Sequence, residues 1–217
     1  SLSELVAALL GLHGVFDNEA MYGIIHADAQ GYYGYLVALF LEQSFDWEQV
    51  IRSYADVYFD GGGADFTVQS ELGRINKYYA GTALLIAPFF LLACLVAWLF
   101  GFPIDGYSAP FQTGIMFCAL FYAGVGMYFL SKFIESKGIS KTISIFTSIC
   151  CLFATGLFHY SLAEPAMSHV YSFSLVSLFM YATSKWFSTD KWSDFLLAAI
   201  FFGLIVLVRP VNGLIIL

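Results

Sequence analysis

Uninterrupted apolar runs constrain the fold of this chain more than any other feature. Residues 79–100 contain no charged side chain, and a helix over this stretch is long enough to cross the roughly 30 Å apolar layer of a bilayer. Because backbone groups in lipid must be hydrogen-bonded within the protein, such runs fold as helices. Similar runs cover 111–130, 142–158, 170–187 and 195–208, and another begins at 211–217. The pattern predicts an all-α, polytopic transmembrane helix bundle.

The composition supports this class. Hydrophobic residues make up 59% of the chain and charged residues 12%, whereas soluble domains average about 45–50% and about 25%. No basic stripe is present that could neutralise phosphates along a nucleic acid, so we expect no nucleic-acid binding. The four cysteines lie inside apolar runs, where they act as small hydrophobes and form no disulfide framework or metal-binding spacing. These are Cys94, Cys118, Cys150 and Cys151.

Charge divides the chain into regions. Acidic residues predominate from position 17 to position 78, where only Arg52, Arg74 and Lys77 oppose them, so this part is expected to face water. We expect three regions: the end of a first transmembrane helix (1–16), an extracytoplasmic loop region (17–110), and transmembrane helices (111–217). The chain stops inside an apolar run, and we expect it to be the N-terminal part of a longer protein.

Short elements are expected in the first loop region. After a loop over 17–30, residues 32–43 have helical periodicity but are too few to span, so they predict a helix lying along the membrane interface with tyrosines as anchors. Asp46 is placed as the N-cap of a second amphipathic helix over 47–57. Strands at 57–59 and 66–68 are expected to flank a glycine-rich turn and form a small hairpin. A calcium loop in that turn has too few spaced oxygen ligands.

Lysines in the short loops predict the orientation. Residues 131–141 and 184–194 contain lysines and are expected in the cytoplasm, whereas 159–169 contain no Lys or Arg and are expected outside. Counting backward puts 101–110 outside as well. If 79–100 spans fully, the acidic region is cytoplasmic; if it is interfacial or re-entrant, that region stays outside. We favour the second alternative, because Pro88 removes a helix hydrogen bond and weakens a straight span.

Asp28 is the first candidate for chemistry. It lies between His26 and Gln30, on an expected loop at the membrane face. A carboxylate there can accept a proton from an acceptor hydroxyl or hold a divalent metal. The alternative is capping of the helix over 32–43.

Glu164 and His169 are the second candidate pair, at the outer ends of helices and therefore at the same expected level as Asp28. An imidazole and two carboxylates around one cleft suit acid–base work or a metal site. Ordinary capping and interfacial polarity are the alternative.

Two cations are candidates for phosphate binding. Arg209 lies between two apolar segments, where its charge is unfavourable unless it meets an anion such as a lipid phosphate, or reaches the interface by snorkelling. Lys77 precedes the apolar run at Tyr79 and is placed to meet a phosphate too.

Four stretches resemble a group of bacterial membrane proteins of the GT-C class of polytopic glycosyltransferases. They are 28–36 (DAQGYYGYL), 77–90 (KYYAGTALLIAPFF), 167–173 (MSHVYSF) and 209–212 (RPVN). The resemblance implies a multi-pass protein of the inner (plasma) membrane. It also implies an enzyme that moves a sugar from a polyprenyl-phosphate donor to an acceptor at the outer face, with membrane lipids around it.

The resemblance maps a carboxylate of the first outer loop, acting as base or metal ligand, onto Asp28. Glu164 is the nearest match to a second acidic residue, and His169 stands where an acid is expected, which leaves metal dependence open. We therefore place Asp28, Glu164 and His169 as catalytic residues. Residues placed as substrate-binding are Lys77, Arg209, Tyr32 and Gln30. The sugar and the acceptor stay open, and the rival functions are a transporter or flippase and a non-catalytic membrane scaffold.

Overall fold

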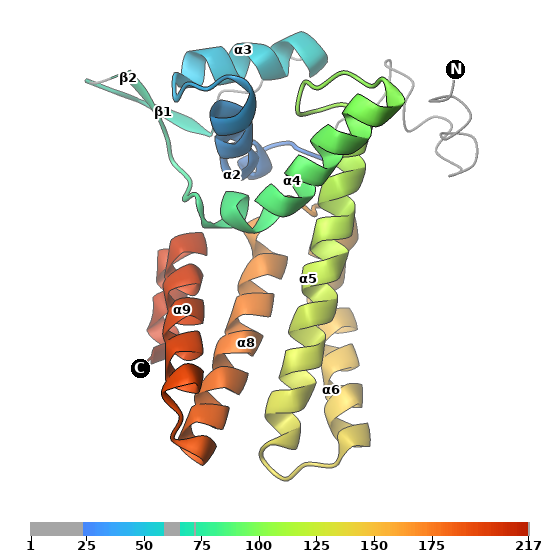
Figure 1. The fold of residues 1–217 in the computed structure, drawn as a ribbon, viewed down its shortest axis with the longest axis vertical. Coiled ribbons are helices and arrows are strands. Elements are labelled where there is room, and N and C mark those ends of the chain that lie inside the picture. The colour runs from blue at the N-terminus through green and yellow to red at the C-terminus, as the bar shows by residue number, and fades with distance from the viewer. Residues whose placement is uncertain (1–23, 59–65, 72, 217) are drawn as a thin grey trace. The chain divides into compact units, whose positions relative to one another are not determined.

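The computed structural model describes residues 24–58, 66–71 and 73–216, with side chains at 56–58 excepted. The expected first transmembrane segment (1–16) and the glycine-rich turn lie outside the described residues. Of the described residues 74% are helical and 4% are in strands, which confirms a mostly helical protein. Helices α4 (Gly81–Phe100) and α5 (Ala109–Glu135) are long and apolar enough to cross a membrane, which indicates membrane association (Figure 1).

The chain forms two compact units. The first unit contains the residues up to Tyr78 together with Ala83–Phe117. The second unit contains Tyr79–Thr82 together with Cys118–Leu217. Each unit has its own core, and each is described by itself.

In the first unit, helix α2 (Asp28–Leu36) continues into a π-helical turn, η1 (Val37–Leu41). The helix expected over 32–43 is therefore present but begins earlier. Asp28 is its first residue, not part of a loop, and Ala27 is the N-cap, with φ 49° and no side-chain cap bond. Tyr32 and Tyr33 are buried in the unit, with 6% and 1% of their surface exposed. Their expected role as interfacial anchors is wrong, because α2 is covered on most sides by protein.

Helix α3 (Trp47–Tyr58) confirms the second predicted helix. Asp46 Oδ1 accepts a hydrogen bond of 3.0 Å from the backbone N–H of Glu48, which satisfies a donor that the helix start leaves open. Trp47, Val50 and Tyr54 are buried, as the spacing of one helix face requires. Asp46 therefore caps α3, as the sequence predicts.

The hairpin is real but displaced from its predicted position. Strands β1 (Thr67–Ser70) and β2 (Gly73–Asn76) pair antiparallel, with Thr67 opposite Asn76 and Ser70 opposite Gly73. Residues 57 and 58, expected in a strand, end α3 instead. Gly73, the first residue of β2, has a φ of 107°, which is easily reached only by glycine. The paired strands are therefore β1 and β2, both of which follow the glycine-rich run in the chain.

Helix α4 continues through Pro88 without interruption. Proline removes one backbone donor, and the remaining apolar residues keep the helix intact, so the expected weakening does not break it. Phe90 packs on Phe111 of α5, with ring centroids 5.2 Å apart, and Gly114 lets the α5 backbone approach Ala93. The re-entrant placement of α4 is not decided by its length and stays a prediction.

The second unit contains most of α5 and four further helices. These are α6 (Lys141–Phe153), α7 (Leu157–Leu162), α8 (Ser168–Thr189) and α9 (Trp192–Val208), followed by a 3-10 helix, η2 (Pro210–Ile216). The prediction of one continuous span over 142–158 is wrong, because α6 ends at Phe153 and a new helix starts at Leu157. The helix expected from 211 is a 3-10 helix that starts at Pro210. Five serines of α8 are buried against neighbouring helices: Ser168, Ser172, Ser174, Ser177 and Ser184.

The core of the second unit lies where α5, α6, α7 and α8 meet. Ala123, Leu157 and Val170 form its centre. Around them pack Tyr122, Leu152, Tyr160 and Phe173. The segment 154–169, which contains α7, is therefore attached directly to the core.

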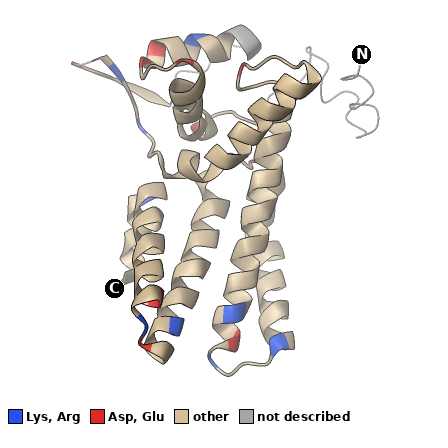
Figure 2. Ribbon diagram, in the orientation of Figure 1, with Lys and Arg blue, Asp and Glu red and all other residues tan. Residues whose placement is uncertain are grey.

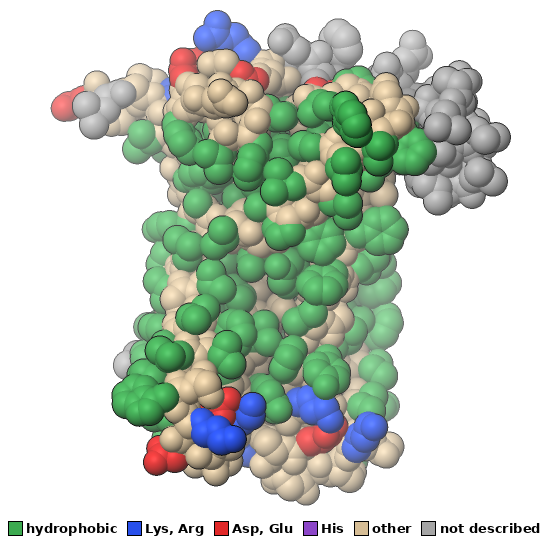
Figure 3. Space-filling model, in the orientation of Figure 1, with side chains coloured by type: hydrophobic (Ala, Val, Ile, Leu, Met, Phe, Trp, Pro, Cys, Tyr) green, Lys and Arg blue, Asp and Glu red, His purple; other side chains and the backbone are tan. Residues whose placement is uncertain are grey.

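The two lysine-bearing turns lie at one end of the second unit (Figure 2). The Lys137 ammonium donates to Ser184 Oγ at 3.0 Å, and Lys185 pairs with the buried Asp194 carboxylate at 3.1 Å. Between the ends, hydrophobic side chains cover the visible face of α5, α8 and α9 (Figure 3). The turn 159–169 lies at the opposite end of the same unit, which is the alternation that the loop charges predict. Which end faces the cytoplasm stays a prediction.

Candidate functional site

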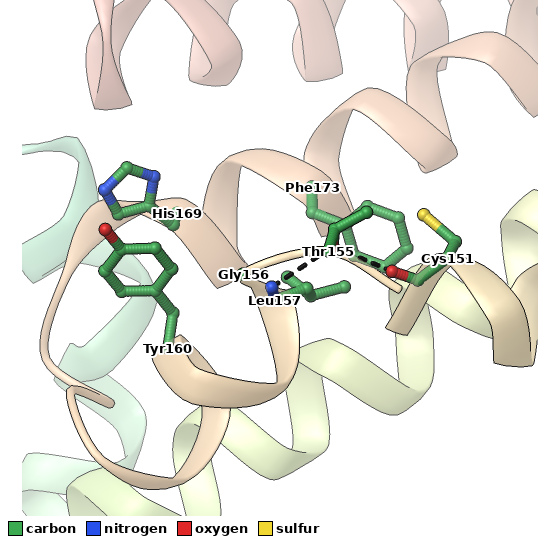
Figure 4. A pocket seen from close by; sticks show the side chains of 7 residues that line it. All are labelled: Cys151, Thr155, Gly156, Leu157, Tyr160, His169 and Phe173. Atoms are coloured by element: carbon green, nitrogen blue, oxygen red, sulfur yellow. Dashed lines mark hydrogen bonds between the residues drawn. The ribbon is translucent and has the colours of Figure 1, made fainter. Parts of the chain in front are cut away.

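A pocket of about 270 Å³ lies at the lysine-free end of the second unit. Its lining comes from α6, α7, α8 and the turn between the first two: Cys151, Thr155, Gly156, Leu157, Tyr160, His169 and Phe173. Tyr160 and His169 lie at one end of the pocket, and Cys151 and Phe173 lie at the other (Figure 4). One end is therefore rich in polar groups and the other is mainly apolar.

The break between α6 and α7 creates the pocket. The Thr155 hydroxyl donates to the Cys151 carbonyl at 2.8 Å and accepts from the Leu157 N–H at 3.2 Å. A threonine hydroxyl that bonds nearby backbone in this way replaces helix hydrogen bonds. The chain therefore leaves α6 and restarts as α7, which brings Tyr160 to the start of α8.

His169 is the second residue of α8, and two groups hold its ring. The Tyr160 ring stacks on the imidazole with centroids 3.9 Å apart and planes 21° apart. The second group is Arg209, whose Nη1 lies 3.3 Å from Nδ1 of His169. Sequence reasoning placed His169 and Arg209 in separate roles, and the fold brings them together.

Arg209 reaches His169 because α9 ends immediately before it. Arg209 has an extended backbone, with φ −151° and ψ 108°, which is the conformation favoured before a proline. A second link joins the same segment to α8, since the Asn212 amide donates to Ser172 Oγ at 3.0 Å. The guanidinium is therefore directed at the start of α8.

Glu164 lies next to His159. Its carboxylate Oε1 lies 3.6 Å from Nε2 of His159. The turn that carries Glu164 is hydrogen-bonded to α8, because the buried Tyr171 hydroxyl donates to the Pro165 carbonyl at 2.8 Å. Sequence reasoning interpreted His159 as an interfacial residue and missed Tyr160, because an aromatic residue nine positions before a histidine is no recognisable motif.

The remaining candidates lie in the first unit. Asp28 is exposed at the N-terminal end of α2, where the helix dipole favours a negative charge, and no side-chain partner of its carboxylate is found among residues 24–58, 66–71 and 73–216. The Tyr32 ring lies 4.8 Å from the Tyr78 ring, and the Lys77 ammonium lies 5.9 Å from that same ring. The Tyr78 ring thus contacts both Lys77 and Tyr32, and Gln30 lies two residues before Tyr32 on α2.

A shared cavity for Asp28, Glu164 and His169 stays a prediction, because the first residue belongs to one unit and the other two belong to the other. Within the part of the chain that the structure describes, no three His, Cys, Asp or Glu side chains gather as a metal site would require. The described donors therefore do not fit a divalent metal.

No family model matches the chain. No curated protein and no solved structure is significantly similar to it. The chemistry of the site therefore rests on its own residues: a guanidinium, an imidazole and a phenol at the polar end of a pocket.

Proposed function

We propose that this chain is part of a bacterial, GT-C-like membrane glycosyltransferase, which moves a sugar from a polyprenyl-phosphate donor to an acceptor at the outer face. In this proposal the helices form a polytopic bundle of the inner membrane, and the end of the second unit that carries 159–169 faces outward. The observation that carries the proposal is the meeting of Arg209 with His169 and Tyr160 beside a pocket with an apolar end.

Arg209 occupies a position that favours an anion. It contacts the second residue of α8, and a helix N-terminus carries a partial positive charge. A cation at such a place is unfavourable by itself, and more so in an apolar region. The close approach of Gly81 to the Leu207–Val208 backbone adds the N-terminus of α4 near the same segment. A phosphate would satisfy the guanidinium and the helix ends together.

The reaction assigns one role to each group. The acceptor oxygen attacks the anomeric carbon, its proton passes to the Asp28 carboxylate, and the bond from that carbon to the phosphate oxygen breaks. Arg209 stabilises the polyprenyl phosphate that leaves. Lys77, Gln30 and Tyr32 of the first unit stay proposed as substrate-binding residues.

Transfer by the full-length protein in nanodiscs tests the proposal. With a polyprenyl-phosphate sugar supplied, Arg209→Met should lower transfer about 10- to 100-fold, because a charge-assisted hydrogen bond contributes about 1.5–3 kcal/mol. The matched control is Arg52→Met, since Arg52 is exposed on α3 and its Nε donates to a backbone carbonyl of its own helix.

Asp28→Asn should lower transfer about 10²- to 10⁴-fold if the carboxylate is the base. Equal transfer by the Arg209 and Arg52 variants would contradict the phosphate role. Movement of the lipid-linked sugar across a vesicle membrane without transfer would favour a flippase instead.

A further inference from the structure

We propose that the lysine-bearing end of the second unit is a docking surface for the headgroups of anionic phospholipids. The surface consists of the turn between α5 and α6 and the turn between α8 and α9, residues 131–141 and 184–194 (Figure 2). The pocket lies at the other end of the same unit. The inference therefore goes beyond the proposed sugar transfer and does not depend on it.

The first observation is an excess of positive charge in the two turns, which together contain five lysines and three carboxylates. Two of the carboxylates are neutralised within the protein, Glu135 by Lys132 at 2.9 Å and Asp194 by Lys185 at 3.1 Å. Among the residues that the structure describes, the other three lysines form no ion pair, and Asp190 is the remaining carboxylate of the turns. These three unpaired lysines are all exposed: Lys137, Lys141 and Lys191.

The second observation is a cluster of aromatic rings beside these lysines. Phe187 and Trp192 keep 77% and 75% of their surface exposed. The Trp192 ring packs on Phe195 with centroids 5.3 Å apart, and Trp186 packs on Phe187 and Phe195 at 4.9 Å and 5.0 Å. Exposed rings of this size are unfavourable in water, whereas tryptophan is enriched at the level of the lipid headgroups. The cluster therefore places the neighbouring lysines at the level of the phosphates.

The third observation is the apolar surface that adjoins the lysines. On the visible face, hydrophobic side chains lie directly next to the charged groups (Figure 3). Large exposed apolar residues of α6 and α9 belong to this surface: Ile143, Phe146, Leu196 and Ile200. Positive charge, aromatic rings and apolar side chains thus follow one another in the order in which a bilayer presents phosphates, interface and acyl chains. An acidic protein would match only the first of these layers, so the occupant is a lipid.

Lys137 links the two turns into one surface. Its ammonium donates to Ser184 Oγ at 3.0 Å, and Ser184 Oγ lies 3.0 Å from Ser136 Oγ. The Ser136 hydroxyl in turn donates to the Phe133 carbonyl at 2.6 Å. An ammonium has three N–H donors, and Ser184 uses one of them. The exposed ammonium therefore keeps donors for the phosphate oxygens of a headgroup.

Quenching of tryptophan fluorescence by brominated lipids tests the surface. The full-length protein is reconstituted into vesicles that contain dibrominated phosphatidylglycerol or dibrominated phosphatidylcholine. The contribution of Trp192 is the difference from Trp192→Phe under the same conditions. We expect the anionic lipid to quench Trp192 at a mole fraction about fivefold lower than the zwitterionic lipid, because one lysine near an anionic surface favours binding about fivefold.

The three unpaired lysines should carry this preference. Lys137→Gln, Lys141→Gln and Lys191→Gln combined should make the two lipids quench equally, and arginine at the same three positions should keep the preference. The matched control is Lys132→Gln with Glu135→Gln, which removes one internal pair and leaves the net charge of the surface unchanged; it should keep the preference as well. High salt should lower the preference of the wild type.

Equal quenching of Trp192 by the two lipids in the wild-type protein would overturn the inference, and so would the absence of quenching by either lipid, which would place this end away from a membrane. A preference that survives in the combined glutamine variant, or that is lost in the arginine variant or the charge-neutral control, would overturn the role of the unpaired lysines. If the glutamine variant fails to fold, as judged by circular dichroism, the wild-type and arginine proteins still decide the question.

Discussion

A methyl group added at Gly81 meets backbone atoms that cannot rotate away. Gly81 is the first residue of α4, and a Cβ built there lies 2.4 Å from Leu207 C, 2.4 Å from Val208 N and 2.5 Å from Leu207 O. Real Cβ contacts of this kind are longer than 3.0 Å, so the start of α4 and the end of α9 must separate. Because Arg209 follows directly, the same shift displaces the guanidinium.

The magnitude follows from two opposed effects. Overpacking of a tight contact costs about 1–3 kcal/mol, and a contact with two backbones belongs in the upper part of that range. Replacing glycine by alanine in a helix gains at most about 1 kcal/mol, and less at the first helical residue. We therefore expect Gly81→Ala to lower the free energy of unfolding by about 1–2 kcal/mol, which is a 5- to 30-fold change in the folded-to-unfolded ratio.

The measurement is denaturant-induced unfolding of the full-length protein in detergent micelles, followed by circular dichroism. Gly203→Ala is the matched control, because Gly203 lies on α9 itself and a Cβ there meets nothing within 4 Å; this variant should be unchanged or more stable by up to about 1 kcal/mol. Gly81→Ala as stable as wild type, or Gly203→Ala as unstable as Gly81→Ala, would refute the argument from close approach.

Two further predictions concern tyrosine hydroxyls. Tyr171→Phe removes the hydrogen bond to the Pro165 carbonyl. The free energy of unfolding should fall by about 1–3 kcal/mol, because a buried acceptor is left without a donor. A decrease in melting temperature smaller than that of Tyr128→Phe, which changes an exposed ring, would contradict this prediction. Burial raises the pKa of Tyr35 above its ordinary value of 10.0, so the unfolded chain loses this proton first and stability falls as pH rises above about 10. Tyr35→Phe should weaken that alkaline loss, and an identical pH dependence would argue against it.

Local signals predicted the elements that depend on local physics. The N-cap at Asp46 with its amphipathic helix is present, since capping needs only the residues next to it. The grouping of the lysine turns at one end of the second unit follows from helices that alternate in direction.

Two predictions from sequence were wrong because they took account of hydropathy or glycine content alone. The run over 142–158 is apolar throughout, but the Thr155 hydroxyl bonds to the backbone and divides it. The hairpin was placed around the longest glycine run, whereas β1 pairs with β2, which begins at Gly73, a glycine with positive φ. A hydropathy pattern contains no information on either the Thr155 hydrogen bonds or the strand pairing.

Sequence by itself determined that this chain is mostly helical, apolar enough for a membrane and acidic in its first third, because composition and periodicity express the solvent that each segment meets. It also singled out His169 and Arg209, each from an unfavourable charge or a polar group beside apolar helices. Only the tertiary structure decided that these two residues, forty positions apart, share one hydrogen bond. That contact depends on where α9 ends against the start of α8, a packing geometry that no local pattern encodes.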